Sequence, residues 1–203
     1  MIIQSLGLGA IKIKNQGQII LIDPATDDIY SKKWRLKPDI LLVSRVNQPI
    51  KNIIGDPFII QSPGEYQKND ILIYGIQTTS KQDQSVIPYY LEIEEMNILH
   101  LGAIKDMLTE KQINELGDID VLFVPVGGNF VLDDEKAAKI IAEIEPEIVV
   151  PIYYQIPGLQ QKLNSIDQFC EEMGIKKRSI DKLVVKKKDL NKEETKIIIL
   201  KAG

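Results

Sequence analysis

The sequence contains only one histidine, His100, and one cysteine, Cys170, among its 203 residues. Zinc hydrolases usually hold their metal with two or three histidines, and dinuclear enzymes use more. A single histidine therefore argues against a metal site built from histidines. A single cysteine excludes an internal disulfide and a cysteine-based structural zinc site. Cys170 lies in SIDQFCEEMGI (165–175), whose pattern predicts the buried face of an amphipathic helix.

Long apolar runs are also missing. The longest, such as the one in TKIIIL (195–200), are far shorter than the roughly 20 residues that a membrane-spanning helix needs. The first residues, MIIQSLGLGAIKIK, lack the basic start and long apolar stretch of a signal peptide. We therefore expect a cytoplasmic protein that does not enter a membrane.

Positive charge is not in surplus, because the formal net charge is −4. This balance predicts no general affinity for nucleic acid. Residues 176–192 are an exception, with eight basic residues against two aspartates. Lysines on a solvated edge strand, where they discourage association between sheets, explain this segment better than RNA binding.

The first half of the sequence predicts strands and the second half alternates helices with strands. A turn with Gly17 joins the second and third strands, and PGEYQKND (63–70) is predicted as a turn. Capping boxes predict helix starts at Thr109, with Gln112, and at Ser165, with Gln168. The predicted strands cover 1–6, 10–14, 19–23, 38–44, 57–62, 71–78, 86–93, 97–102, 121–128, 147–154, 182–188 and 195–200, and the predicted helices cover 108–117, 132–146 and 165–175.

This order of elements suits two sheets packed between helix layers. The chain has no Gly/Ser linker, no low-complexity tract and no short repeat. We expect a single domain over residues 1–203, with a basic, strand-rich C-terminal segment at about 176–203.

Three stretches resemble the metallo-β-lactamase-fold hydrolases, and most of all the bacterial branch of ascorbate-6-phosphate-lactonase-like proteins. They are GQIILIDP (17–24), SPGEYQKNDILIYGI (62–76) and the long stretch from HLGAIKDM to YYQIPGL (100–159). The resemblance implies an α/β fold, a four-layer αββα sandwich, with the functional site at one edge between the two sheets.

In that family the strand matching DILLVS (39–44) is followed by a Thr-His-x-His-x-Asp-His motif that supplies metal ligands. Here residues 44–50 read SRVNQPI, so Arg45, Asn47 and Ile50 stand where the three histidines would be. Pro49 stands in place of the aspartate. Arginine does not lose its proton to bind a metal, and isoleucine and proline offer no ligand atom.

At three further positions where the family resembled here has metal ligands, this sequence has other residue types. Ser80 lies near the expected position of a histidine, Ala103 replaces the bridging aspartate of a Gly-Asp pair, and Tyr153 replaces the final histidine. We therefore predict no metal and no other cofactor. The expected vestigial pocket contains Asp23, which is similar to an aspartate near the family's metal site, together with Arg45, Asn47, Ser80, Ala103 and Tyr153.

Individual residues of this region have competing interpretations. Arg45 either replaces the charge of the metal by pairing with Asp23, or points into solvent from its loop. His100, at the end of an apolar strand, is expected to be a buried structural histidine. Glu65 is predicted to lie in a turn, and the glycine pair of VPVGGNF (124–130) lacks the other residues of a phosphate-binding loop.

Loss of the ligands predicts a non-catalytic binding or interaction module with no catalytic residues, a pseudoenzyme of a zinc-dependent hydrolase family. One alternative is a metal-independent hydrolase acting in the same cleft, with Arg45 stabilising an oxyanion and Tyr153 or Glu65 as acid or base. The other is an RNA-binding relative that uses the basic C-terminal segment. A protein partner or small ligand and a homo-oligomer fit this expectation, and nucleic acid fits it poorly.

Overall fold

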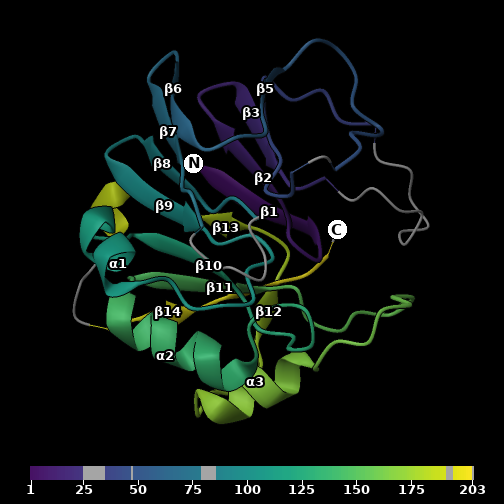
Figure 1. Ribbon diagram of the computed structural model, residues 1–203, viewed down its shortest axis with the longest axis vertical. Coiled ribbons are helices and arrows are strands. Elements are labelled where there is room, and N and C mark those ends of the chain that lie inside the picture. Colours follow the sequence, from purple (N-terminus) through teal and green to yellow (C-terminus); the bar gives the residue numbers. More distant parts are fainter. Residues whose placement is uncertain (25–34, 47, 79–85, 191–193, 203) are drawn as a thin grey trace.

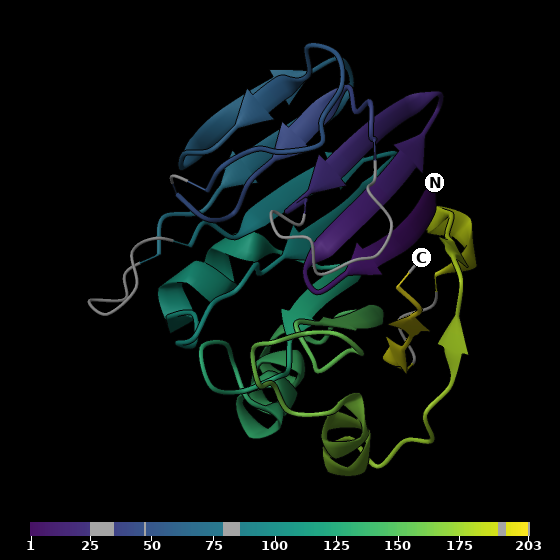
Figure 2. The same ribbon diagram turned by 90° about the vertical axis from the view of Figure 1, so that its right-hand side faces the viewer.

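The structure is a computed structural model that describes residues 1–24, 35–46, 48–78, 86–190 and 194–202. Two large β-sheets pack face to face (Figure 1). Viewed from the side, the three α-helices of the described chain all lie against one of the two sheets (Figure 2). This arrangement confirms the α/β sandwich that the resemblance implies.

The first sheet has the strand order β13-β1-β2-β3-β4-β5. β1, β2 and β3 are antiparallel, and Gln16 and Gly17 form the turn between β2 and β3 with φ of 44° and 84°. β4 and β5 continue the sheet parallel to β3. The strands are β1 (Ile2–Gly7), β2 (Ala10–Asn15), β3 (Gln18–Ile22), β4 (Ile40–Leu42), β5 (Phe58–Ile60) and β13 (Leu183–Val184).

The second sheet has the order β14-β11-β10-β9-β8-β7-β6. β6 to β9 are antiparallel, whereas β9, β10, β11 and β14 run parallel. The strands are β6 (Gly64–Lys68), β7 (Ile71–Gly75), β8 (Tyr89–Ile93), β9 (Met96–His100), β10 (Val121–Pro125), β11 (Ile148–Ile152) and β14 (Lys196–Ile197). The prediction of a turn for PGEYQKND was wrong, since most of it pairs with β7 as strand β6 and only Asn69 and Asp70 make the turn.

The helices are α1 (Glu110–Leu116), α2 (Asp134–Ile144) and α3 (Ile166–Glu172). The Thr109 side chain accepts from the Gln112 amide, and the Gln112 side chain accepts from the Thr109 amide, which confirms the predicted capping box. Ser165 precedes α3 as predicted, but its side chain makes no capping hydrogen bond. No helix in the described part of the chain is long and apolar enough to cross a membrane.

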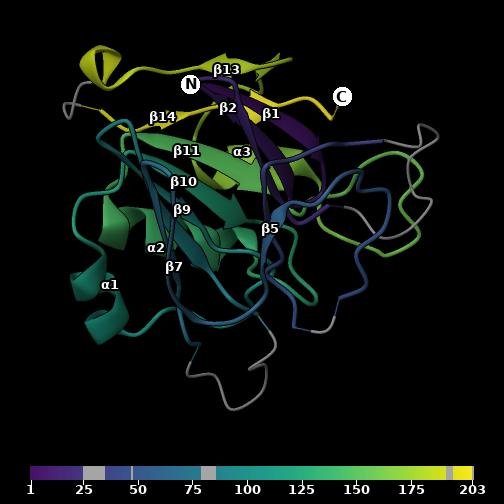
Figure 3. The same ribbon diagram turned by 90° about the horizontal axis from the view of Figure 1, so that it is seen from above.

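The C-terminal segment closes an edge of each large sheet, as Figure 3 shows from above. β13 pairs with β1 and β14 pairs with β11. Between β13 and β14 in the chain, η1 (Lys187–Asp189) forms one 3-10 turn. β12 (Ser179–Ile180), which precedes β13, pairs with β15 (Ile199–Leu200), which follows β14. The lysine-rich segment therefore lies at sheet edges, as predicted.

The main core lies between the two sheets and consists largely of isoleucine, leucine and valine. Tyr89 crosses this core, and its hydroxyl lies 3.0 Å from the carbonyl oxygens of Val43 and Ile60, at the ends of β4 and β5. A second core packs the helices on the second sheet. On the outer face of the first sheet, partly buried Leu36, Ile50 and Ile53 cover a smaller cluster, and no helix of the described residues takes part in it.

Candidate functional site

Asp23 and Ser44 meet at the carboxyl ends of β3 and β4. These strands are parallel, so the residues that follow them emerge at the same edge of the sheet. The Asp23 carboxylate accepts from the Ser44 amide at 2.6 Å and from the Ser44 hydroxyl at 2.5 Å. Both residues are buried, and Asp23 adopts a φ of 48°. Ser44 thereby fixes the orientation of the carboxylate.

Tyr153 approaches the same carboxylate from the second sheet, directly after β11. Its hydroxyl donates to Asp23 Oδ2 over 3.5 Å, and its amide donates to the carbonyl of Leu8 over 3.2 Å. The Tyr153 ring lies on Gly9, so closely that a Cβ on Gly9 would be 2.2 Å from a ring carbon. Because Gly9 has no side chain, the Tyr153 hydroxyl can reach Asp23 across the edge between the sheets.

Both ring nitrogens of His100 form hydrogen bonds with the backbone beside this site. Its Nδ1 accepts from the Gly102 amide at 3.1 Å, so the proton lies on Nε2, which donates to the Gly9 carbonyl at 3.0 Å. The ring is fully buried, and burial lowers its pKa below 6.5, although the nearby Asp23 charge acts in the opposite direction. His100 is thus a neutral structural residue, as predicted.

Arg45 does not pair with Asp23. Its guanidinium carbon lies 5.9 Å from the centre of the Phe130 ring, a cation–π arrangement. The described partners of the Asp23 carboxylate are Ser44 and Tyr153. The hypothesis that Arg45 replaces the charge of a metal beside Asp23 was therefore wrong in its geometry. The alternative, an arginine that only points into solvent, was also incomplete, because the side chain is partly buried.

Ala103 is fully buried in a small apolar cluster that also contacts Phe130 and Tyr153. The preceding Gly102, with a φ of 64°, lies so close to Ser44 that an added Cβ would be 2.7 Å from the Ser44 hydroxyl. The structure therefore gathers Asp23, Tyr153 and Ala103 with Arg45 at their margin. The other two predicted pocket residues, Asn47 and Ser80, lie outside the described residues.

Ser44 is the site residue to which the sequence interpretation assigned no role. Its position at the end of a buried strand was the available signal, because such ends collect functional side chains in layered α/β proteins. Glu65 does not join the site: it pairs across the strands with Tyr74 and lines a separate surface cavity beside α1. The glycine pair of VPVGGNF serves packing, since a Cβ on Gly127 would be 2.1 Å from the Tyr153 carbonyl oxygen.

The donor atoms of this site do not fit a metal centre. Asp23 already accepts hydrogen bonds at both carboxylate oxygens, and both nitrogens of His100 are engaged with the backbone. Ala103 offers no ligand, Ile50 packs against apolar residues, and the guanidinium of Arg45 has donors but no acceptor atom. Within the part of the chain that the structure describes, no group of three or more histidine, cysteine or carboxylate side chains could hold a metal ion.

Comparison with known proteins shows which family this chain resembles. The model of the Beta-lactamase superfamily domain matches residues 2–153. A metal-dependent hydrolase of Methanopyrus kandleri is 30% identical over 90 residues, which is 44% of this chain and 39% of that protein. A metal-dependent hydrolase of Lysinibacillus sphaericus is 38% identical over 72 residues, 35% of this chain and 32% of that protein. The matched segments thus span well under half of either relative.

A crystal structure from Thermotoga maritima, described as a Zn-dependent hydrolase of the metallo-β-lactamase superfamily, matches 98% of this chain and 97% of that chain, with 26% identity and a TM-score of 0.83. These relatives overturn the expectation of a non-catalytic pseudoenzyme, because they are named as hydrolases. That expectation inferred loss of activity from loss of ligands, although a site can keep a reaction class while it changes its chemical groups.

Proposed function

Because the chain belongs to the beta-lactamase superfamily, whose domain model matches residues 2–153 of its 203, we propose that it is a hydrolase that acts at the Asp23–Tyr153 site with its own side chains. The observation that carries the proposal is the contact of the Tyr153 hydroxyl with the Asp23 carboxylate, 3.5 Å apart across the edge between the sheets. The cytoplasmic location is proposed with it, from the sequence alone.

Asp23 is suited to the role of general base. A carboxylate offers about four acceptor positions, and three donors occupy this one: the Ser44 amide, the Ser44 hydroxyl and the Tyr153 hydroxyl. The remaining position can hold a water molecule and take its proton as the water oxygen attacks an ester or phosphoester. The two short hydrogen bonds from Ser44 hold the carboxylate in one orientation, which a general base requires.

Tyr153 and Arg45 supply the other two roles. The Tyr153 hydroxyl, already directed at the site, can donate a proton to the leaving oxygen as its bond to carbon or phosphorus breaks. The positive charge of the Arg45 guanidinium can stabilise the negative oxygen that develops during attack. The guanidinium lies over the ring of Phe130, which packs against the same apolar cluster as Tyr153.

The test is hydrolysis of a panel of lactones and phosphoesters by the purified protein, before and after treatment with a chelator and with its zinc, manganese and iron content measured. We expect chelator-resistant hydrolysis with less than about a tenth of an equivalent of each metal. Asp23→Asn, which keeps the shape of the side chain, should lower kcat at least about 100-fold, and Tyr153→Phe about 10-fold or more.

Asp70→Asn is the matched control, because Asp70 is an exposed carboxylate in the β6–β7 turn. Its activity should equal that of the unmodified protein, and thermal unfolding of all variants separates lost chemistry from lost folding. Hydrolysis that disappears with the chelator and returns with zinc would refute the proposal in favour of a metal-dependent reaction. Equal loss in Asp23→Asn and Asp70→Asn would also refute it.

A further inference from the structure

An acidic cavity of about 450 Å³ lies at the amino ends of β10 and β11. Tyr153 follows the carboxyl end of β11, and five residues of strand span roughly 17 Å, so the two sites are separate. The lining of the cavity carries five carboxylate side chains: Asp118, Asp120, Glu145, Glu147 and Glu194. A cavity with this charge attracts cations and repels anionic ligands.

Glu147 distinguishes this cavity from an ordinary acidic surface. Its backbone is held on both sides, by the amide donating to Ile119 and the carbonyl accepting from Lys196. The residue is only 8% exposed, and its buried Oε2 has no hydrogen-bond partner in the described structure. A buried carboxylate oxygen without a donor is unfavourable. Glu147 lines the cavity, so a cationic donor bound there would lie beside a carboxylate that lacks a partner.

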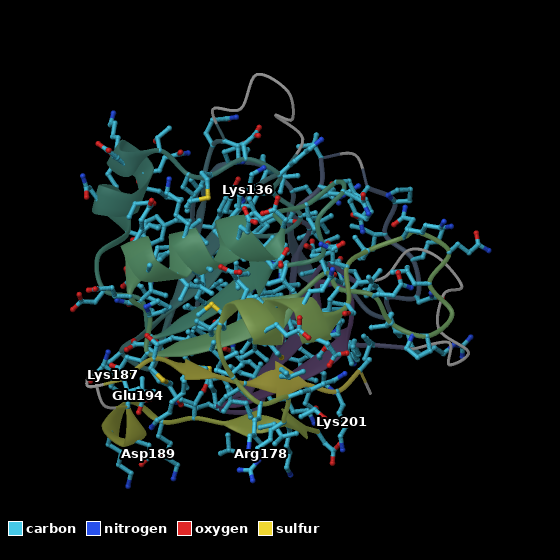
Figure 4. The ribbon with its side chains drawn as sticks, turned by 90° about the horizontal axis from the view of Figure 1, so that it is seen from below. Lys136, Arg178, Lys187, Asp189, Glu194 and Lys201 are labelled. Atoms are coloured by element: carbon cyan, nitrogen blue, oxygen red, sulfur yellow. The ribbon has the colours of Figure 1, made fainter. Side chains whose placement is uncertain are left out.

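The chain itself shows which kind of cation fits. The Lys187 ammonium lies 2.9 and 2.8 Å from the two oxygens of Asp120, whose side chain is 2% exposed. The Asn97 amide also donates to Asp120, at 2.7 Å. Lys187 and Glu194 belong to the same edge of the molecule (Figure 4). One side of the cavity thus already binds an ammonium group, while Glu147 has no such partner.

The arrangement favours an extended organic cation over a metal ion. A metal needs several ligands around one point, and no group of three or more histidine, cysteine or carboxylate side chains among the described residues could provide that. The carboxylates are instead spread around a volume in the range of small-molecule sites. We propose that this cavity binds a linear aliphatic polyamine, with one ammonium donating to Glu147 and another near Glu145 and Glu194.

Isothermal titration of the full chain with spermidine, at roughly 20 mM ionic strength where screening is weak, tests the proposal. We expect saturable one-to-one binding that Glu147→Gln weakens about tenfold or more, because a hydrogen bond to a charged group is lost. Glu143→Gln is the matched control, since Glu143 is an exposed glutamate of α2 outside the cavity. It should change the affinity by less than about twofold.

A second variant should respond more strongly to spermidine than the unmodified protein does. Lys187→Gln removes the built-in ammonium and leaves Asp120 in need of a cation, so spermidine should raise the Tm of this variant more than that of the unmodified protein. Absence of saturable binding would overturn the proposal, as would equal weakening by Glu147→Gln and Glu143→Gln. Stoichiometric binding of Mg²⁺ or Ca²⁺ that displaces spermidine would also overturn it. Because only binding is measured, the outcome does not depend on hydrolase activity.

Discussion

Replacement of Gly9 by alanine should push the Tyr153 ring away from Asp23 and destabilise the protein by about 1–3 kcal/mol. The new Cβ would lie 2.2, 2.5 and 2.7 Å from Cε2, Cζ and the hydroxyl oxygen of Tyr153, where ordinary contact begins at 3.4 Å. The ring must therefore move by more than about 1 Å. The Tyr153 hydroxyl is already 3.5 Å from Asp23, so this movement breaks the contact.

The backbone of Gly9 does not oppose the substitution. Gly9 is not among the residues with positive φ, so alanine adopts its conformation without strain. Alanine should even stabilise by about 0.4–1 kcal/mol, because it restricts the unfolded chain. Once Tyr153→Ala removes the ring, Gly9→Ala should be neutral or slightly stabilising. The coupling free energy between the two substitutions is then about 1–4 kcal/mol.

Urea unfolding of the original protein, the two single variants and the double variant measures this coupling, with free energies of unfolding obtained by linear extrapolation. The whole cost of Gly9→Ala is expected to come from its contact with the Tyr153 ring. A Gly9→Ala variant that loses the same stability with and without the Tyr153 ring would refute it. In the Tyr153-containing background, hydrolase activity should fall together with stability, since the ring position serves both.

Two further substitutions test the surroundings of Asp23. Burial holds the pKa of His100 below 6.5, so below pH 6.5 the unfolded chain binds a proton that the folded protein does not. The free energy of unfolding should therefore keep its full His100 contribution above pH 6.5. It should fall by up to about 1.4 kcal/mol per pH unit as the pH decreases towards the lowered pKa. Urea titrations of the original protein and His100→Gln should show this slope only in the original, and parallel curves would contradict it. Gly102→Ala should cost about 2–3 kcal/mol, because its Cβ would meet the Ser44 hydroxyl at 2.7 Å. Gly174→Ala has the same φ of 64° with open space around it, so it should cost only about 1 kcal/mol, and an equal loss in both would refute the steric argument.

The elements of this fold were predictable where short-range chemistry decides them. Thr109 and Gln112 form the predicted capping box, and Gly17 makes the predicted hairpin turn with Gln16. PGEYQKND was mispredicted because its turn-forming residues dominate the local pattern, whereas pairing with β7 decides its structure. A strand at the edge of a sheet obtains its hydrogen bonds from a neighbour, and local propensity carries little information about that neighbour.

The candidate site depended far more on tertiary structure. Asp23, Ala103 and Tyr153 could be grouped in advance only through resemblance to a family, and Arg45 was expected to meet Asp23 but packs on Phe130. The expectation of lost activity failed for a related reason. Missing ligands describe only a metal site, whereas the similar proteins are named as hydrolases.

The sequence by itself determined the alternation of helices and strands in the second half, the start of α1 after Thr109 and the turn at Gly17. These properties depend on residue types and on neighbours within a few positions. Only the tertiary structure decided that Tyr153 reaches Asp23, 130 residues earlier in the chain, and that Glu147 is buried without a donor. Both depend on the register of distant strands, and the Tyr153 contact depends also on the space that Gly9 leaves open. These arrangements arise only when the whole chain packs.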